Sequence, residues 1–364
     1  RKVAGVSLLK EFGAAEAVWH FDVVDFRGVV AMDAHGNSLF ETVRRKSANI
    51  LRMMMMTFAV ALLASVAAVA AETDVILDAH PDWMELHAKA VELAKKNMEK
   101  LDGWKTQMTC MPGVGIIWQW DSCYMALFAG YTPGDYNGLG NLDNLYRMQG
   151  KDGYISMAYT YATREPTWPG RINPPLYAWC EWLYARRTGD KSRLARAYDA
   201  CTKFYKWLKA NRTRKANGLY WFEDAGSSGM DNSPRFDGPM TLAAADFNAY
   251  LARECEAMSR LQPERREYWL GHHDRICEGL NRFCWDEELG LYVDYDTVAK
   301  KRMDVMSSAG FMPLLCGAPS KEQVARMVAH LHNPKTFGTP FRVPSIAACN
   351  TAAYKKDMWR GPAW

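Results

Sequence analysis

Three segments of the sequence, residues 116–125, 168–179 and 220–236, place tryptophans beside acids or amides. The last part of the chain, 356–364, has a similar composition. Aromatic faces with a few fixed polar groups suit a sugar ring, because its C–H faces stack on indole while its hydroxyls need paired donors and acceptors. The residues of the three segments that could line such a site include Trp118, Gln119, Trp120, Asp121, Trp168, Arg171, Asn173 and Asp231. A carbohydrate is therefore the ligand class that these loops indicate.

The acids in these loops also have a structural explanation. Asp121 falls at the start of a predicted helix, where an aspartate is a natural N-cap. Asp231 stands in the sequence Asp-Asn-Ser-Pro, which is also good chemistry for the start of a helix. Trp118, taken alone, fits a core position better than a ligand platform. The residues by themselves leave the role of Asp231 open, and a helix cap is the commoner use of a loop aspartate.

The sequence lacks other patterns of catalysis or metal binding. His272 and His273 are adjacent and would point apart on a helix, and His330 and His332 have no third ligand nearby. There is no Gly-x-Ser-x-Gly motif, phosphate-binding glycine loop or dinucleotide fingerprint. We therefore expect neither a metal nor an organic cofactor.

Composition and charge indicate a soluble globular protein. The apolar share is 49%, which is ample for a large core in a chain of 364 residues. From residue 71 onward, 37 basic and 35 acidic residues nearly cancel, so the sequence shows no electrostatic footprint for nucleic acid. The nine cysteines are scattered, odd in number and without Cys-x-x-Cys spacing. We expect most of them to be buried as small apolar residues rather than to form a disulfide framework.

Residues 53–71 have the order of a secretory signal peptide. Basic residues at 44–46 and 52 precede an apolar run, and Ala68-Val69-Ala70 is a plausible cleavage site. A membrane anchor is the alternative, because nineteen apolar residues can just span a bilayer, but the run is rich in alanine rather than leucine. We expect a secreted or periplasmic protein with no membrane association after cleavage, or an anchored one if the segment is kept.

A signal peptide belongs at the start of a protein, yet residues 1–52 precede this one and the chain opens on Arg1. We expect translation to begin among Met53–Met56, and residues 1–52 to be read-through or an unrelated fragment.

The remainder, 72–364, is predicted to be one helical domain. Apolar spacing and end signals predict helices at 81–101, 173–190, 190–211 and 238–262, and further ones at about 121–130, 138–149, 264–284 and 319–332. The segment 289–296 is the only good strand, as an arm of a short hairpin. Helices that arrive in pairs, with the candidate site residues in the loops between them, indicate an all-α helical barrel or solenoid.

Several motifs in a fixed order carry a family resemblance. The segments WQWDSCYMAL, NPPLYAWCEWLYARRTGD, SGMDNSPRFD, WDEELGLYVDYD, FGTPFRVPSIA and DMWRGPAW together resemble glycoside hydrolase family 63 and its mannosylglycerate-hydrolase-like branch. The family 37 trehalases are more distant relatives. The resemblance covers most of 81–364 and implies an (α/α)6 barrel that acts as an inverting, exo-acting glycosidase on an α-glucoside or α-mannoside.

The resemblance also implies roles for individual residues. Asp231 falls on the general acid, Trp120 and Asp121 on a pair that binds the glycone, and Trp359 and Arg360 on a loop that lines the pocket. The other expected substrate-binding residues are Trp118, Gln119, Asn173 and Gly229, and Asn173 stands where relatives often carry Gln. An oligosaccharide or small glycoside is the expected partner.

The general base of relatives is a Glu well beyond the Trp-Arg-Gly-Pro motif. We therefore expect the base to lie beyond Trp364 and the barrel to be truncated at its C-terminus, so that the chain as given would be inactive. Glu223 and Asp224 do not replace the base, because they share a loop with the acid. The alternatives are an α,α-trehalase and, in another class, a non-catalytic glycan-binding toroid.

Overall fold

The computed structural model describes residues 80–127, 129, 131, 138–213, 217–222, 224–238 and 240–363, all within a compact unit that spans Asp74–Trp364. The predicted signal peptide and residues 1–52 lie outside the described residues. Within the described ranges, none of the helices combines the length and the apolar character needed to cross a bilayer.

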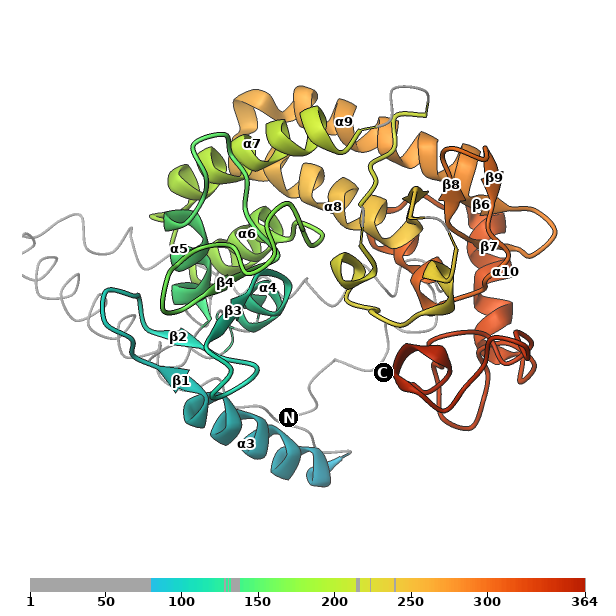
Figure 1. Ribbon diagram of the computed structural model, residues 1–364, viewed down its shortest axis with the longest axis horizontal. Helices are drawn as coiled ribbons and strands as arrows, with labels where there is room; N and C mark the ends of the chain where they lie inside the picture. Colours follow the sequence, from blue (N-terminus) through green and yellow to red (C-terminus); the bar gives the residue numbers. More distant parts are fainter. Residues whose placement is uncertain are drawn as a thin grey trace, which may run out of the picture. The chain divides into compact units, whose positions relative to one another are not determined.

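The described part of the unit is mainly helical, and every predicted helix is present (Figure 1). The helices are α3 (Pro81–Lys96), α4 (Gln119–Leu127), α5 (Leu139–Arg147), α6 (Tyr177–Thr188), α7 (Leu194–Asn211), α8 (Ala245–Leu261), α9 (Arg266–Gly279) and α10 (Lys321–His332). The largest difference from the prediction concerns α8, which begins at Ala245 rather than near 238. The strand β5 (Leu242–Ala243) occupies the chain just before it.

The helices form two layers. Helices α4, α6 and α8 contact one another in turn, and each also packs against the helix that follows it in sequence, α5, α7 or α9. Helix α8 shows the difference most clearly, because most of its residues are buried, whereas only Met327 is fully buried on α10. A helix that is buried on nearly all sides belongs to the inner layer. This alternation is the arrangement expected for an (α/α) barrel.

Short strands and short helices connect these layers. The pairs are β1 (Met98–Glu99) with β2 (Gln107–Met108), β3 (Ile116–Trp118) with β4 (Ala158–Thr160), and β6 (Trp285–Asp286) with β7 (Leu291–Tyr292), while β5 pairs with β8 (Tyr295–Asp296) and β8 with β9 (Lys301–Arg302). All are antiparallel. The short helices are η3 (Ala225–Ser228), η4 (Pro234–Phe236), η5 (Pro263–Arg265), η6 (Leu280–Cys284), η7 (Ser308–Cys316) and η8 (Met358–Arg360).

The prediction of a single strand over 289–296 was wrong. It is divided between β7 and β8, which belong to different sheets. Between them the buried Asp294 turns its carboxylate to a buried arginine, Arg235, instead of extending a ladder.

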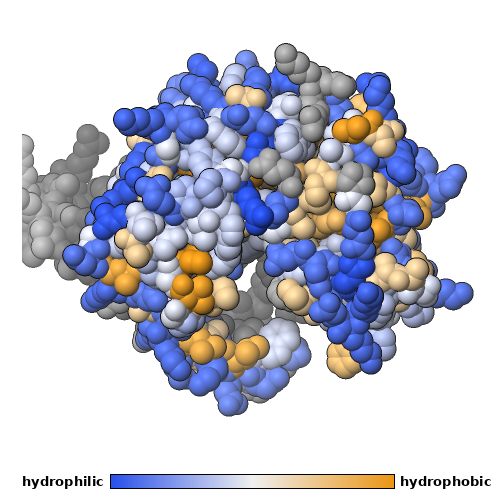
Figure 2. Space-filling model, in the orientation of Figure 1, coloured by the Kyte–Doolittle hydropathy of each residue, from blue (hydrophilic) through white to orange (hydrophobic). Residues whose placement is uncertain are grey.

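The surface in Figure 2 is largely hydrophilic, with hydrophobic side chains in separate small groups. One such group belongs to α3, where Trp83, Leu86 and Leu93 are exposed. The interior is formed by the two layers of helices, and its buried residues run from Ile117 on β3 to Ala347 beyond α10.

Candidate active site

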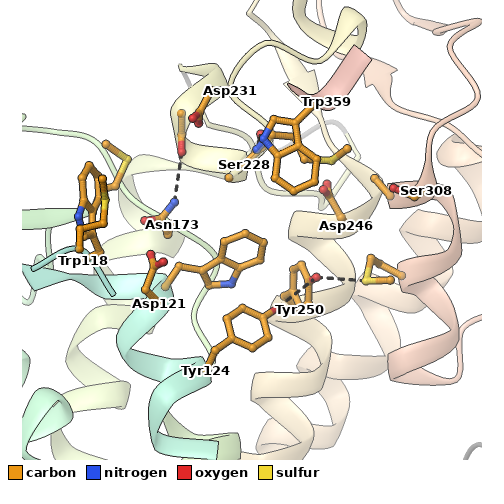
Figure 3. A pocket seen from close by; sticks show the side chains of 18 residues that line it. Trp118, Asp121, Tyr124, Asn173, Ser228, Asp231, Asp246, Tyr250, Ser308 and Trp359 are labelled. Carbon is orange, nitrogen blue, oxygen red and sulfur yellow. Dashed lines mark hydrogen bonds between the residues drawn. The ribbon is translucent and has the colours of Figure 1, made fainter. Parts of the chain in front are cut away.

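A pocket of about 720 Å³ opens where the ends of α4 and α8 meet the loops that carry η3, η7 and η8. Figure 3 shows its side chains. Its lining consists of Met111, Trp118, Trp120, Asp121, Tyr124, Met157, Asn173, Gly226, Ser228, Gly229, Met230, Asp231, Asp246, Tyr250, Ser308, Ala309, Met312 and Trp359. Nine of these eighteen residues are aromatic or methionine, and three aspartates lie among them.

Asp231 is not a helix cap. It stands in a turn after η3, and the residue at the N-cap of η4 is Ser233. Within the described residues the Asp231 carboxylate makes no hydrogen bond or ion pair, and the side chain lines the pocket (Figure 3). Partial burial, and then the negative charges of Asp224 and Asp121, raise the pKa of Asp231 above its ordinary value. These three features suit a carboxyl group that must keep its proton until a substrate arrives.

Gly229 allows the loop that carries Asp231, here called the acid loop, to pack closely against Trp120. Its φ of +71° lies in the left-handed region, and a Cβ added there would come within 2.1 Å of Cζ3 of Trp120. Gly229, expected from the sequence to bind substrate, does lie in the pocket lining, and the neighbour that an added Cβ would meet is a protein side chain. The Trp120 ring also meets Tyr124 and Tyr250 edge-to-face, at centroid distances of 5.3 and 5.6 Å. Trp120 therefore joins α4, α8 and the acid loop.

Asn173 and Gln119 hold the wall of the pocket together through buried hydrogen bonds. Nδ2 of Asn173 donates to the carbonyl of Ser227 at 3.0 Å, so the segment 168–179 is tied to η3 just before the acid. Nε2 of Gln119 donates to the carbonyl of Pro174 at 3.2 Å, which ties the same segment to the start of α4. Asn173 lines the pocket, but Gln119 is completely buried behind it and is not part of the lining.

Asn232, the residue after Asp231, fixes the loop that carries Trp359. Its Oδ1 accepts the backbone N–H of Trp359 at 2.9 Å, and its Nδ2 donates to Asp357 at 3.0 Å. Arg360 donates to the carbonyl of Asn232 and forms a bidentate pair with Asp237 at 2.8 and 2.6 Å. Arg360 is therefore outside the lining and holds two loops together, while Trp359 forms part of the pocket wall.

A buried cluster of charged side chains lies next to the pocket. The Arg235 guanidinium lies between the carboxylates of Asp246 and Asp294, with four hydrogen bonds of 2.8 to 2.9 Å. Arg235 is only 1% exposed, and burial of such a charge is tolerated only when it is paired and hydrogen-bonded. Because Arg235 follows the acid by four residues, these bonds anchor the loop after Asp231 to the start of α8. The two carboxylates share one guanidinium, so the cluster keeps one net negative charge.

Trp118 and Asp121 complete the other side of the pocket. Trp118 ends β3 and packs on Trp168 at a centroid distance of 5.3 Å. Helix α4 begins at Gln119, so Asp121 lies in its first turn rather than at the N-cap. An acid in the first turn still interacts favourably with the helix dipole.

The structure therefore brings seven of the nine predicted site residues into one pocket lining: Trp118, Trp120, Asp121, Asn173, Gly229, Asp231 and Trp359. The sequence interpretation missed Tyr124, Asp246, Tyr250 and Met312. The available sequence signal for Asp246 was its position as an acid in the first turn of a long helix. That signal does not show that Asp246 lines a pocket, because α4, α8 and η7 come together only in the folded structure. Within the described residues, no group of three or more His, Cys, Asp and Glu side chains is arranged to hold a metal.

Comparison with known proteins defines the class of the domain. Residues 116–364 match the family described as "Mannosylglycerate hydrolase MGH1-like glycoside hydrolase domain". The mannosylglycerate hydrolase of Thermus thermophilus is 24% identical over 365 aligned positions, which cover 76% of this chain and 84% of that protein. An uncharacterized protein of Borreliella burgdorferi is 27% identical over 237 residues, and the match spans 63% of this chain and 49% of that protein.

Solved structures agree on the fold. The GH63 mannosylglycerate hydrolase from Thermus thermophilus in complex with glucose has a TM-score of 0.65 at 24% identity, covering 77% of this chain and 83% of its own. The neutral trehalase Nth1 from Saccharomyces cerevisiae has a TM-score of 0.55 at 18% identity, covering 76% of this chain and 66% of its own.

Residues 1–43 match a different family, described as "Fumarase C-terminus".

The domain that contains the pocket is a glycoside hydrolase domain with the (α/α)6 toroid fold. The chain belongs to the MGH1-like glycoside hydrolase family. Both the family 63 resemblance and the helical-toroid prediction are thereby confirmed.

Proposed function

We propose that the protein is an inverting, exo-acting α-glycosidase in which Asp231 is the general acid. The observation that carries the proposal is the Asp231 carboxyl itself, which makes no hydrogen bond or ion pair within the described residues, lines an aromatic pocket and has a raised pKa. The glycone would stack on the tryptophan faces, and Asp121 would accept hydrogen bonds from its hydroxyls. An α-glucoside or α-mannoside is the proposed substrate class.

The chemistry follows from the inverting mechanism. Asp231 would give its proton to the glycosidic oxygen as the bond to the anomeric carbon breaks, and a carboxylate across the ring would take a proton from the attacking water. The two carboxyl groups of such a pair stand roughly 6.5–9.5 Å apart. Asp246 suits this second role poorly, because Arg235 already binds both of its oxygens. We propose a Glu as the base, in keeping with the family resemblance.

Product stereochemistry and substrate choice test this proposal. The full-length protein should release the β-anomer first from an α-glucoside or α-mannoside, as recorded by proton NMR during the first minutes of turnover. Initial release of the α-anomer would contradict inversion. Trehalose cleaved well ahead of all other substrates would favour the trehalase alternative, which the likeness to the yeast trehalase fold keeps open. Sugar binding without any turnover would favour the glycan-binding toroid.

Export is a separate proposal. We propose that residues 53–71 act as a secretory signal and that the mature protein is secreted or periplasmic. The support is the order of basic, apolar and small residues in that segment. N-terminal sequencing of the protein recovered from the periplasm or medium should give a start near Ala71. An intact segment in a membrane fraction would instead show an anchor.

A further inference from the structure

Two cysteine thiols meet where the outer helix α9 contacts the end of η7. All nine cysteines are unbridged in the structure, and six of them are buried. Cys277 on α9 is half-buried, and its Sγ lies 3.9 Å from Sγ of Cys316, the last residue of η7. The two sulfur atoms are therefore in direct contact, although the residues are far apart in the sequence.

Hydrogen bonds on both sides hold the two thiols in this position. His273 lies one helical turn before Cys277, and its Nε2 is 3.0 Å from the carbonyl oxygen of Cys316. Nδ2 of Asn281, on η6, donates to the carbonyl oxygen of Ala318 at 2.7 Å. The backbone around Cys316 is thus tied to α9 and to the turn that follows it, which keeps the sulfur atoms together.

The neighbouring histidine does not turn this pair into a metal site. Nε2 of His273 faces the Cys316 carbonyl, and its Nδ1 lies 2.8 Å from the carboxylate of Asp274. Both ring nitrogens are therefore engaged by protein oxygens, in keeping with the lack of a metal-holding group among the described residues. The chemistry that remains for the pair is that of two adjacent thiols.

We propose that Cys277 and Cys316 form a modification site, at which oxidation makes a disulfide that fixes the end of η7 to α9. The sulfur atoms of a disulfide are about 2.05 Å apart, so the two atoms must approach by about 1.9 Å. Rotation about the two Cα–Cβ bonds is the movement that closes such a gap. Since η7 contributes Ser308, Ala309 and Met312 to the pocket lining, the bond would stiffen one wall of the pocket.

The oxidant is a small or protein disulfide, and the reaction is thiol–disulfide exchange. Cys277 reacts first, because Cys316 is only 2% exposed. The Cys277 thiolate attacks one sulfur of the carrier disulfide and displaces a carrier thiolate. The Cys316 thiolate then attacks the Cys277 sulfur of the mixed disulfide and displaces the second carrier thiolate. The two protein thiols lose two electrons and two protons, and the carrier becomes two thiols.

The surroundings of the thiols affect how fast they react. The hydrogen bond to Cys316, and then burial, raise the pKa of the Cys277 thiol. Because the thiolate is the attacking form, exchange is slow at neutral pH and is best followed to completion. An oxidising compartment, such as the one given by the export proposal, would keep the bond formed.

Peptide mapping of the full-length protein tests the proposal. The protein is held with excess oxidised glutathione, or with a reducing dithiol, until no further change occurs, and the remaining thiols are then alkylated. We expect the oxidised sample to give a linked peptide pair that contains Cys277 and Cys316, with two hydrogens fewer than the separate peptides. Glutathione left on Cys277 without a bridge, or a bridge between other cysteines only, would overturn the proposal.

Thermal unfolding measures the effect of the bond. The bridge closes a loop of about 40 residues, so the oxidised protein should unfold at a temperature roughly 5 to 10 °C above that of the reduced protein. Cys277→Ser should abolish this difference, whereas Cys349→Ser, which changes an exposed cysteine, should retain it. Equal unfolding temperatures for the bridged and the reduced wild type would show that the bond does not fix η7. The wild-type measurements decide the question even where a variant fails to fold.

Discussion

The carboxyl group of Glu254 should make the stability of the domain depend on pH. Glu254 lies on the inner helix α8, is only 4% exposed, and accepts the backbone N–H groups of Ala178 and Trp179 at 2.8 and 3.2 Å. It thereby caps the start of α6 from a neighbouring helix. Burial outweighs these hydrogen bonds and raises the pKa of Glu254 from 4.5 to about 7.

The direction of this pKa shift determines how the stability of the domain changes with pH. Below about pH 4.5 the carboxyl is protonated in both the folded and the unfolded state, and its contribution to stability is fully present. As the pH rises towards 7, the unfolded chain releases the proton while the folded chain retains it, so stability is lost. A pKa rise from 4.5 to about 7 corresponds to about 3 kcal/mol of unfolding free energy.

Glu254→Gln removes this titration. The variant should be less stable by about 1 kcal/mol at every pH, because its amide NH2 faces a backbone N–H whose hydrogen bond the carboxylate accepted. Urea unfolding between about pH 4.5 and pH 7 should show the wild type losing about 3 kcal/mol relative to the variant. Glu256→Gln is the matched control, because that residue lies on the same helix and faces Arg253 and Arg260. Parallel pH profiles for wild type and Glu254→Gln would refute this reasoning.

Two further predictions concern the loops around the pocket. Gly229→Ala should destabilise the domain by about 3 kcal/mol, because it combines backbone strain with a clash against Trp120. Gly218 has the same φ of +71° but open space around it, so Gly218→Ala should cost only the strain. Equal urea midpoints for the two variants would contradict the close packing of Gly229 on Trp120. Asn232→Ala should weaken sugar binding about tenfold by releasing the Trp359 loop, with the overall fold retained. Tryptophan fluorescence titration checks this, and an unchanged dissociation constant would show that the loop is held by other contacts.

The sequence predicted the helices well, because their apolar periodicity is strong and their ends carry ordinary signals. It failed where tertiary contacts decide the conformation. In 289–296 almost every residue is buried, so the alternation that marks a strand gives no information on where β7 ends and β8 begins. Glu254 lies within the predicted helix 238–262 with no local feature that marks it, yet it caps the start of α6 from a neighbouring helix. Such a role depends on how two helices cross and leaves no local pattern.

The candidate site was predictable only in part for the same reason. The order of several motifs pointed to Asp231, Trp120 and Trp359, and these residues do meet in one pocket. The sequence could not show that Gln119 and Arg360 lie behind the lining. Their hydrogen bonds to Pro174 and Asp237 are contacts between distant segments.

The most direct test of the account is the turnover of Asp231→Asn in the full-length protein with two kinds of substrate. An α-glycoside with an alkyl aglycone needs a proton on its leaving oxygen, whereas an α-glycosyl fluoride needs little help from an acid. We predict that the variant loses a factor of about a thousand or more in kcat on the alkyl glycoside and keeps much of its activity on the fluoride, with sugar binding nearly unchanged. Wild-type turnover of the alkyl glycoside would contradict the assignment of Asp231 as the general acid.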